Sequence, residues 1–183
     1  MWKTETALAD IYRKKLLTEI YNEVNKCKNS QGKFPSVNNR RCQTVTGKRP
    51  KSITFGKRPD TQHQRNLFPN EPEFRANARY PKLYRLLKEY HKKFHRKHKY
   101  SVILVNKQVQ FIKHKDKGNV EGSTNIIVGC GDYTGGELTL FDENDIPKSH
   151  NIRFQPLEFN PFQYHQVEEF TGDRVSITYY KTS

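Results

Sequence analysis

Residues 101–180 constrain the fold most, because this stretch is divided into short segments rich in β-branched and aromatic residues. Turn-forming glycines and prolines separate the segments, among them Gly118, Gly122, Gly135, Gly136, Pro147, Pro161 and Gly172. Short strands with turn signals at this spacing predict an antiparallel sandwich or barrel such as a jelly roll. The predicted strands are 101–106, 109–114, 125–128, 137–141, 151–154, 157–160, 164–168 and 174–180.

The N-terminal part of the chain favours helices and loops. Apolar residues recur at helical spacing over 5–26 and again within 74–98, where Pro81 is suited to a first helical turn. The apolar stripes are Leu8, Ile11, Tyr12, Leu16, Ile20 and Val24 in the first helix, and Leu83, Leu86, Leu87, Tyr90 and Phe94 in the second. Residues 27–72 are rich in proline and glycine, with short strands expected around Val45 and 53–55.

These patterns predict an α+β protein with one compact domain. Residues 100–183 are expected to form a jelly-roll core, and residues 1–99 a basic, helical and loop-rich region that supports it. The helices should pack their apolar stripes on the sheet.

Charge is unevenly distributed between these two parts. The net charge is +14, but residues 1–100 hold 25 Lys and Arg against 8 Asp and Glu, whereas residues 101–183 hold 8 against 11. A strongly basic region attracts polyanions. We therefore predict that nucleic acid, DNA or RNA, binds through the N-terminal half. For the basic face of the second helix, a merely solvated surface is an equal alternative.

Several features indicate the compartment. The three cysteines share no metal-type spacing, and charged residues interrupt the first twenty positions, which is unlike a signal peptide. No apolar run reaches the ~18–20 residues of a membrane span. The prediction is an intracellular protein, nuclear or cytoplasmic, without a membrane partner. The basic clusters from Arg40-Arg41 to Lys51 are a weak candidate for a nuclear import signal.

A candidate metal site lies in the predicted core. His114 and Asp116 stand two apart in a predicted strand, so both side chains leave the same face. His165 follows on a later strand, and nine residues further come Arg174 and Ser176, again two apart. Two imidazoles and one carboxylate form a facial triad that suits non-haem Fe(II), and a guanidinium can hold the far carboxylate of a 2-oxo acid.

One rival exists for the second histidine ligand. His150 follows a likely loop and has no Arg-x-Ser pair nine residues later, so His165 is favoured.

These residues resemble a known family. The elements His114-Lys115-Asp116, His165 and Arg174-Val175-Ser176 look like the HxD…H…RxS pattern of the 2-oxoglutarate/Fe(II)-dependent dioxygenases, whose fold is a double-stranded β-helix (jelly roll). The resemblance covers about residues 100–183. Gly135-Gly136-Glu137-Leu138 is similar to a GGEL strand common in these enzymes, where glycines allow a tight turn.

A finer resemblance concerns two further segments. Residues 131–136 and 170–174 look most like a protist, algal and viral branch akin to the TET/JBP nucleobase oxygenases. The N-terminal half carries no motif that matches TET or JBP.

The resemblance implies roles for six residues. His114, Asp116 and His165 would bind Fe(II), Arg174 and Ser176 would anchor 2-oxoglutarate, and Asn106 would also contact this co-substrate. With O₂, the expected reaction is hydroxylation of a C–H bond, on a methylated nucleobase in nucleic acid. The alternatives are a prolyl- or lysyl-type protein hydroxylase and a non-catalytic jelly-roll module that binds nucleic acid.

Other side chains have weaker expectations. Tyr133, Asn119 and Asn125 are candidates to face the substrate, although turn and surface roles are more common. The aromatic residues Phe162, Tyr164, Tyr179 and Tyr180 are expected in the core. On the second helix, His91, His95 and His98 are expected to be solvated or to contact phosphate, with a metal site as the minor alternative.

Overall fold

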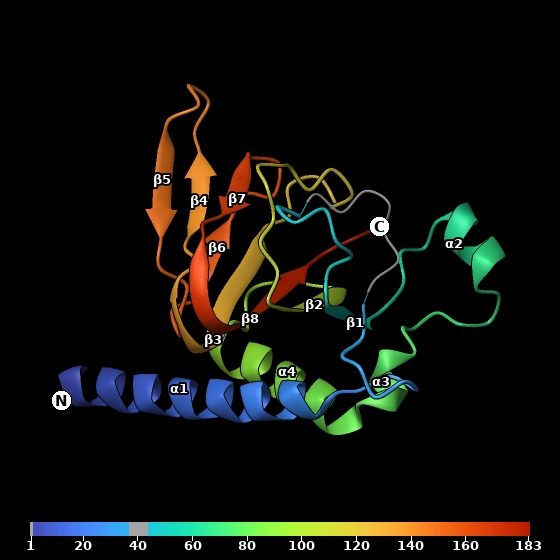
Figure 1. The fold of residues 1–183 in the computed structure, drawn as a ribbon, viewed down its shortest axis with the longest axis horizontal. Helices are drawn as coiled ribbons and strands as arrows, with labels where there is room; N and C mark the ends of the chain where they lie inside the picture. Colours follow the sequence, from blue (N-terminus) through green and yellow to red (C-terminus); the bar gives the residue numbers. More distant parts are fainter. Residues whose placement is uncertain (1, 37–43) are drawn as a thin grey trace.

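A computed structural model describes residues 2–36 and 44–183. Two antiparallel sheets face each other, and helices cover the outer side of the larger sheet (Figure 1). The helices are α1 (Trp2–Lys26), α2 (Gln62–Leu67), α3 (Ala76–Arg79) and α4 (Pro81–Phe94). The strands are β1 (Ser52–Gly56), β2 (Val102–Lys107), β3 (Asn125–Gly135), β4 (Leu138–Phe141), β5 (Pro147–His150), β6 (Leu157–Phe159), β7 (His165–Val167) and β8 (Phe170–Tyr180).

The order of the strands defines the fold. The larger sheet has the order β1-β2-β8-β3-β6 and the smaller sheet the order β5-β4-β7. From β3 onward the chain crosses repeatedly between the sheets, with β3, β6 and β8 in the larger one and β4, β5 and β7 in the smaller one. This alternation is a double-stranded β-helix, so the predicted α+β fold with a jelly-roll core and helices packed on the sheet is confirmed.

Strand β8 shows how alternation separates core from site. Its residues Val175, Ile177 and Tyr179 are fully buried against the helices, in one hydrophobic cluster with residues of α1 and α4. Because successive strand residues point to opposite faces, Arg174 and Ser176 point between the sheets. A second cluster, made of Ile127, Leu138, Ile152, Phe159 and Val167, fills part of that space.

The two long helices run antiparallel beneath the larger sheet. The ring of Tyr12 lies 6.1 Å from that of Phe94, and Lys82 pairs with Glu23 at 2.9 Å, so the start of α1 meets the end of α4. Helix α4 begins with Pro81, and its predicted apolar stripe packs on the sheet as expected.

The predicted stripe of α1 is only half right. Its C-terminal residues Leu16, Ile20 and Val24 are buried, but Leu8 and Ile11 are 63% and 65% exposed. The cause is geometric, because the N-terminal end of α1 extends past the sheets (Figure 1).

Two of the predicted strands are wrong and one strand was not predicted. Residues 109–114 pair only at isolated positions, Phe111 with Thr44 and His114 with His165, and residues 151–154 pair only at Arg153 with Gly129. Left-handed backbone at Gln108 (φ 55°) and Phe154 (φ 56°) interrupts extended structure in these segments. Strand β5 is polar and exposed, which hid it from a hydrophobic pattern.

The predicted division at residue 100 crosses a continuous sheet. Strand β1 of the N-terminal region pairs with β2 along its whole length, from Ser52 opposite Asn106 to Gly56 opposite Val102. The expectation of a short strand at 53–55 is confirmed.

Cysteines and helices bear on the predicted compartment. Cys27 and Cys130 are free and buried, and burial raises their thiol pKa to about 11 and about 12, respectively. In the part of the chain that the structure describes, no helix combines the length and apolar character needed to cross a membrane. The Arg40-Arg41 pair and Cys42 lie outside the described residues.

Candidate iron and co-substrate site

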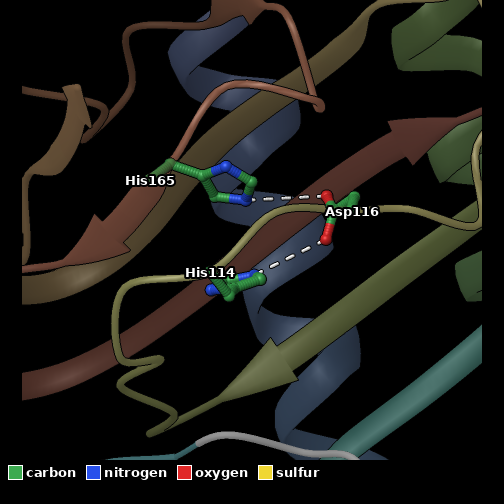
Figure 2. A group of neighbouring side chains, drawn as sticks. All are labelled: His114, Asp116 and His165. Atoms are coloured by element: carbon green, nitrogen blue, oxygen red, sulfur yellow. Dashed lines mark ion pairs between the residues drawn. The ribbon is translucent and has the colours of Figure 1, made fainter. Parts of the chain in front are cut away.

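The structure brings His114, Asp116 and His165 together between the sheets, with Asp116 facing both imidazoles (Figure 2). His165 is the first residue of β7, whereas His114 and Asp116 lie in the connection between β2 and β3. The backbone N–H groups of His114 and His165 each donate to the other's carbonyl at 2.9 Å. This reciprocal pair of bonds holds the two rings 4.4 Å apart.

Both imidazoles are oriented by their own backbone. The Nδ1 of His114 lies 2.7 Å from the carbonyl oxygen of Ile112, and the Nδ1 of His165 lies 2.8 Å from that of Gln163. A carbonyl oxygen only accepts, so each Nδ1 carries the proton. Each Nε2 is therefore the ligating atom, as in metal sites whose histidines donate their other N–H to a carbonyl.

Asp116 completes the set. Its Oδ1 lies 3.5 Å from the Nε2 of His114 and its Oδ2 lies 3.6 Å from the Nε2 of His165. Burial alone would raise the pKa of Asp116, but hydrogen bonds and charge from both imidazoles lower it well below its usual value. For His114, burial opposes protonation, yet the bond to Asp116 leaves its pKa raised. One atom from each residue falls within a group whose members are all within 4.8 Å of one another.

Two asparagines extend this site. Asn125, buried on β3, donates from Nδ2 to the Oδ2 of Asp116 at 3.0 Å. Asn119 in turn donates to the Oδ1 of Asn125 at 2.6 Å, which fixes the orientation of that amide. Both residues had been expected to face substrate; instead, their amides form a hydrogen-bonded chain that ends on the carboxylate. No sequence motif signalled this role.

The three side chains differ in exposure. His165 is buried, whereas the side chains of His114 and Asp116 are 23% and 33% exposed. The site is therefore reached from the side of His114 and Asp116.

Arg174 is a fully buried guanidinium on the inward face of β8. Its Nη2 donates to the carbonyl of Gly136 at 3.1 Å and its Nη1 to that of Val109 at 3.4 Å, while its Nε has no partner. Within residues 2–36 and 44–183, it forms no ion pair with a carboxylate. Burial lowers the pKa of Arg174, and a buried cation without an anion is costly.

Ser176 and Asn106 share the inward face with Arg174. They are opposite one another in the β2–β8 ladder, and both are buried. The Oδ1 of Asn106 accepts a hydrogen bond from the hydroxyl of Ser52 at 2.5 Å. The predicted co-substrate residues thus lie together, with one oxygen of Asn106 already engaged.

Comparisons with known proteins agree on the architecture. No protein-family model matches the chain, and no curated protein matches it either. An oxidoreductase of the 2OG-Fe(II) oxygenase family from Burkholderia pseudomallei superimposes with a TM-score of 0.56 and 14% identity, over 90% of this chain and 77% of that one. The chain has the fold of the 2-oxoglutarate/Fe(II) oxygenases. OsALKBH1 is similar in the same way, with a TM-score of 0.54, 15% identity and coverage of 90% and 91%.

Within this oxygenase fold, the rival ligand lies elsewhere. His150 ends β5 and pairs with Leu138, outside the group formed by His114, Asp116 and His165. Tyr133, expected to face substrate, is instead buried beside Arg174.

The aromatic and histidine expectations have mixed outcomes. Tyr179 is in the core as predicted, but Tyr164 is 46% exposed and lines a surface groove together with Phe162. His91 is buried and bonded to His98 across 3.0 Å, so the expectation of solvated or phosphate-contacting histidines is wrong for this pair. The His98 ring also contacts the carbonyl of Thr124 at 2.8 Å, which ties α4 to the start of β3.

Proposed function

We propose that the protein is an Fe(II)/2-oxoglutarate-dependent dioxygenase that hydroxylates a C–H bond. One observation carries the proposal: a group of two Nε2 atoms and a carboxylate lies between the same two sheets as a buried arginine without an acidic partner. Two histidines and a carboxylate suit Fe(II) with open coordination positions. A buried guanidinium suits a carboxylate ligand.

The proposed division of labour follows from these donors. His114, Asp116 and His165 would hold the iron, with the Nδ1–H bonds to Ile112 and Gln163 maintaining the ring orientations. Arg174 and Ser176 would bind the distal carboxylate of 2-oxoglutarate, and Asn106 would line the same pocket. With Fe(II) bound, O₂ and 2-oxoglutarate become succinate and CO₂ while one oxygen atom enters the substrate C–H bond.

For the substrate, we propose a methylated base in nucleic acid. Charge supports this class, since the chain carries a net +14 concentrated before residue 101. The exposed residues Lys48, Arg49 and Lys51 belong to a segment whose Thr44 pairs with Phe111, and the Phe111 ring is 5.6 Å from that of His114. By contrast, α4 lies on the outer face of the larger sheet, away from the inward-facing Arg174.

A surface groove beside the metal ligands supports the same class. Lys113 and Lys115 alternate with His114 and Asp116 along the chain, and both ammonium groups lie over the ring of Tyr164, at 5.3 and 4.4 Å. Exposed aromatic rings combined with lysines are typical of surfaces that bind single-stranded nucleic acid.

Product analysis tests both levels of the proposal. The protein, Fe(II) and 2-oxoglutarate are incubated with methylated DNA, methylated RNA and a peptide panel, and succinate and modified products are measured by mass spectrometry. We expect succinate with wild type, none with His114→Ala or Asp116→Ala, and an oxidised base in a nucleic acid. A hydroxylated peptide would replace the substrate class with a protein hydroxylase. Absence of succinate with every substrate would favour the non-catalytic binding module.

A further inference from the structure

Tyr133 and Arg174 each bury a polar atom that has no hydrogen-bond partner. These atoms are the hydroxyl oxygen of Tyr133 and the Nε of Arg174. The two side chains are neighbours, because the guanidinium carbon lies 5.5 Å from the centre of the Tyr133 ring. Tyr133 is only 3% exposed, so solvent does not reach its hydroxyl. A buried hydroxyl without a partner is unfavourable, which indicates that a ligand group belongs beside it.

The position of the hydroxyl is set by Gly129. Tyr133 and Gly129 are four residues apart on β3 and so point to the same face. A Cβ built at Gly129 would lie 2.0 Å from the Tyr133 hydroxyl, so the oxygen occupies space that any other residue at 129 would fill. Gly129 is opposite Ser176 in the β3–β8 ladder, and the next inward pair is Gly131 opposite Arg174. The phenol therefore reaches over the Arg174-x-Ser176 pair.

We propose that Tyr133 binds the distal carboxylate of 2-oxoglutarate, donating its O–H alongside the guanidinium of Arg174. This inference rests on the proposed function. A carboxylate offers about four acceptor sites, so it can accept from Arg174, Ser176 and Tyr133 together. Hydrogen bonds from a hydroxyl to a carboxylate are short and about twice as strong as neutral ones.

The protonation state of the phenol is consistent with a donor. Burial raises the pKa of Tyr133, with the positive charge of Arg174 opposing the shift. The phenol thus keeps its proton at neutral pH and presents an O–H rather than a second anion.

A packing role is the alternative, and substitution by phenylalanine separates the two. The Tyr133 ring also contacts Phe170 edge-on at 6.5 Å and the guanidinium of Arg153 at 5.7 Å. Tyr133→Phe keeps these ring contacts and removes only the hydroxyl. Tyr179→Phe is the matched control, because Tyr179 is a buried tyrosine on the outward face whose hydroxyl donates to Leu87.

Calorimetric titration of the Mn(II)-loaded protein under anaerobic conditions tests the assignment. We expect Tyr133→Phe to weaken 2-oxoglutarate binding about 10–100-fold, the range for one hydrogen bond to a charged group. Binding of oxalate, which chelates a metal but has no distal carboxylate, should be unchanged in Tyr133→Phe. Tyr179→Phe should bind both ligands like wild type, and Gly129→Ala, which displaces the hydroxyl, should resemble Tyr133→Phe.

The outcomes distinguish this inference from the function on which it rests. If wild type binds 2-oxoglutarate, Arg174→Ala binds it weakly and Tyr133→Phe binds it like wild type, the role of Tyr133 is overturned and the proposed function stands. An equal loss of oxalate binding in Tyr133→Phe would also overturn the role, since the effect would not concern the distal carboxylate. If wild type binds no 2-oxoglutarate at all, the proposed function fails first.

Discussion

Gly136 leaves the space through which the side chain of Arg174 enters the pocket. A Cβ at position 136 would lie 2.6 Å from the Nε and 2.9 Å from the Cδ of Arg174. The carbonyl of Gly136 also accepts from the Nη2 of Arg174 at 3.1 Å. The turn between β3 and β4 and the candidate co-substrate anchor are therefore one structural unit.

Gly136→Ala tests this relationship. The methyl group clashes with Arg174, and the backbone at 136 is left-handed (φ 67°), so we expect stability to fall by about 1–3 kcal/mol and 2-oxoglutarate binding to weaken. Denaturant unfolding and calorimetry measure the two effects. Gly122→Ala is the control, since its φ is 75° but nothing lies within 4 Å of the added methyl. If both variants bind 2-oxoglutarate equally well, Gly136 has no role in placing Arg174.

Asn125→Ala should weaken metal binding. The substitution removes the hydrogen bond to the Oδ2 of Asp116, and loss of such a partner of a ligand typically reduces metal affinity 10–100-fold. Titration with Fe(II) or Co(II) measures the change. Asn119→Ala should have a smaller effect, because it only frees the amide of Asn125. Equal affinity in wild type and Asn125→Ala would remove the asparagine from the site.

Stability should depend on pH through two histidines of the α4 region. Burial lowers the pKa of His91 and His95 to about 4, reinforced by His98 in both cases, by Lys99 for His91 and by Arg13 for His95, while Glu158 opposes the shift of His95. The unfolded value is ~6.5, so between about pH 6.5 and 4 the unfolded chain binds protons that the folded chain does not. Stability should be full above this window and fall as the pH drops through it, by on the order of 3 kcal/mol per histidine.

Urea unfolding of the apoprotein across this pH range checks the expectation. His91→Phe should flatten the profile, whereas His63→Phe, at an exposed position on α2, should leave its shape unchanged. Parallel profiles for wild type and His91→Phe would contradict the assignment.

Substrate binding should depend on the basic loop more than on α4. Replacing Lys48, Arg49 and Lys51 by glutamine should weaken nucleic-acid binding and reduce the salt dependence by up to ~0.7–0.9 per lost phosphate contact. The control replaces Arg85, Lys92 and Lys97, which are exposed on α4 at the outer face. Binding measured against salt concentration compares the two. A larger loss in the α4 variant would place the polyanion on the helical side of the molecule.

The sequence predicted the fold well where apolar patterns are strong. Residues of α4 and β2 were assigned correctly, because each has one face buried in the helix–sheet cluster. Strand β3 continues to Gly135, seven residues beyond its predicted end, because the glycines at 129, 131 and 135 lack the β-branched signal of a strand. These glycines allow close approach by Tyr133, Asp173 and Glu169, which is a tertiary requirement.

For the site, local motifs predicted the residues that share a strand face but not the contacts between strands. The pairing of His114 with His165 depends on two backbone bonds between segments about fifty residues apart. The link from Asn125 to Asp116 and the contact of Tyr133 with Arg174 likewise arise only when β3 is placed beside its neighbours. No spacing rule connects these residues along the chain.

The central claim is that His114, Asp116 and His165 hold one Fe(II) beside a 2-oxoglutarate site. Anaerobic calorimetric titration with Fe(II), followed by 2-oxoglutarate, tests it most directly. We predict one Fe(II) per wild-type chain, loss of Fe(II) binding in Asp116→Ala and His165→Ala, and retained Fe(II) binding with weakened 2-oxoglutarate binding in Arg174→Ala. Wild-type protein that binds no Fe(II), or His165→Ala that binds it as tightly as wild type, would contradict the claim.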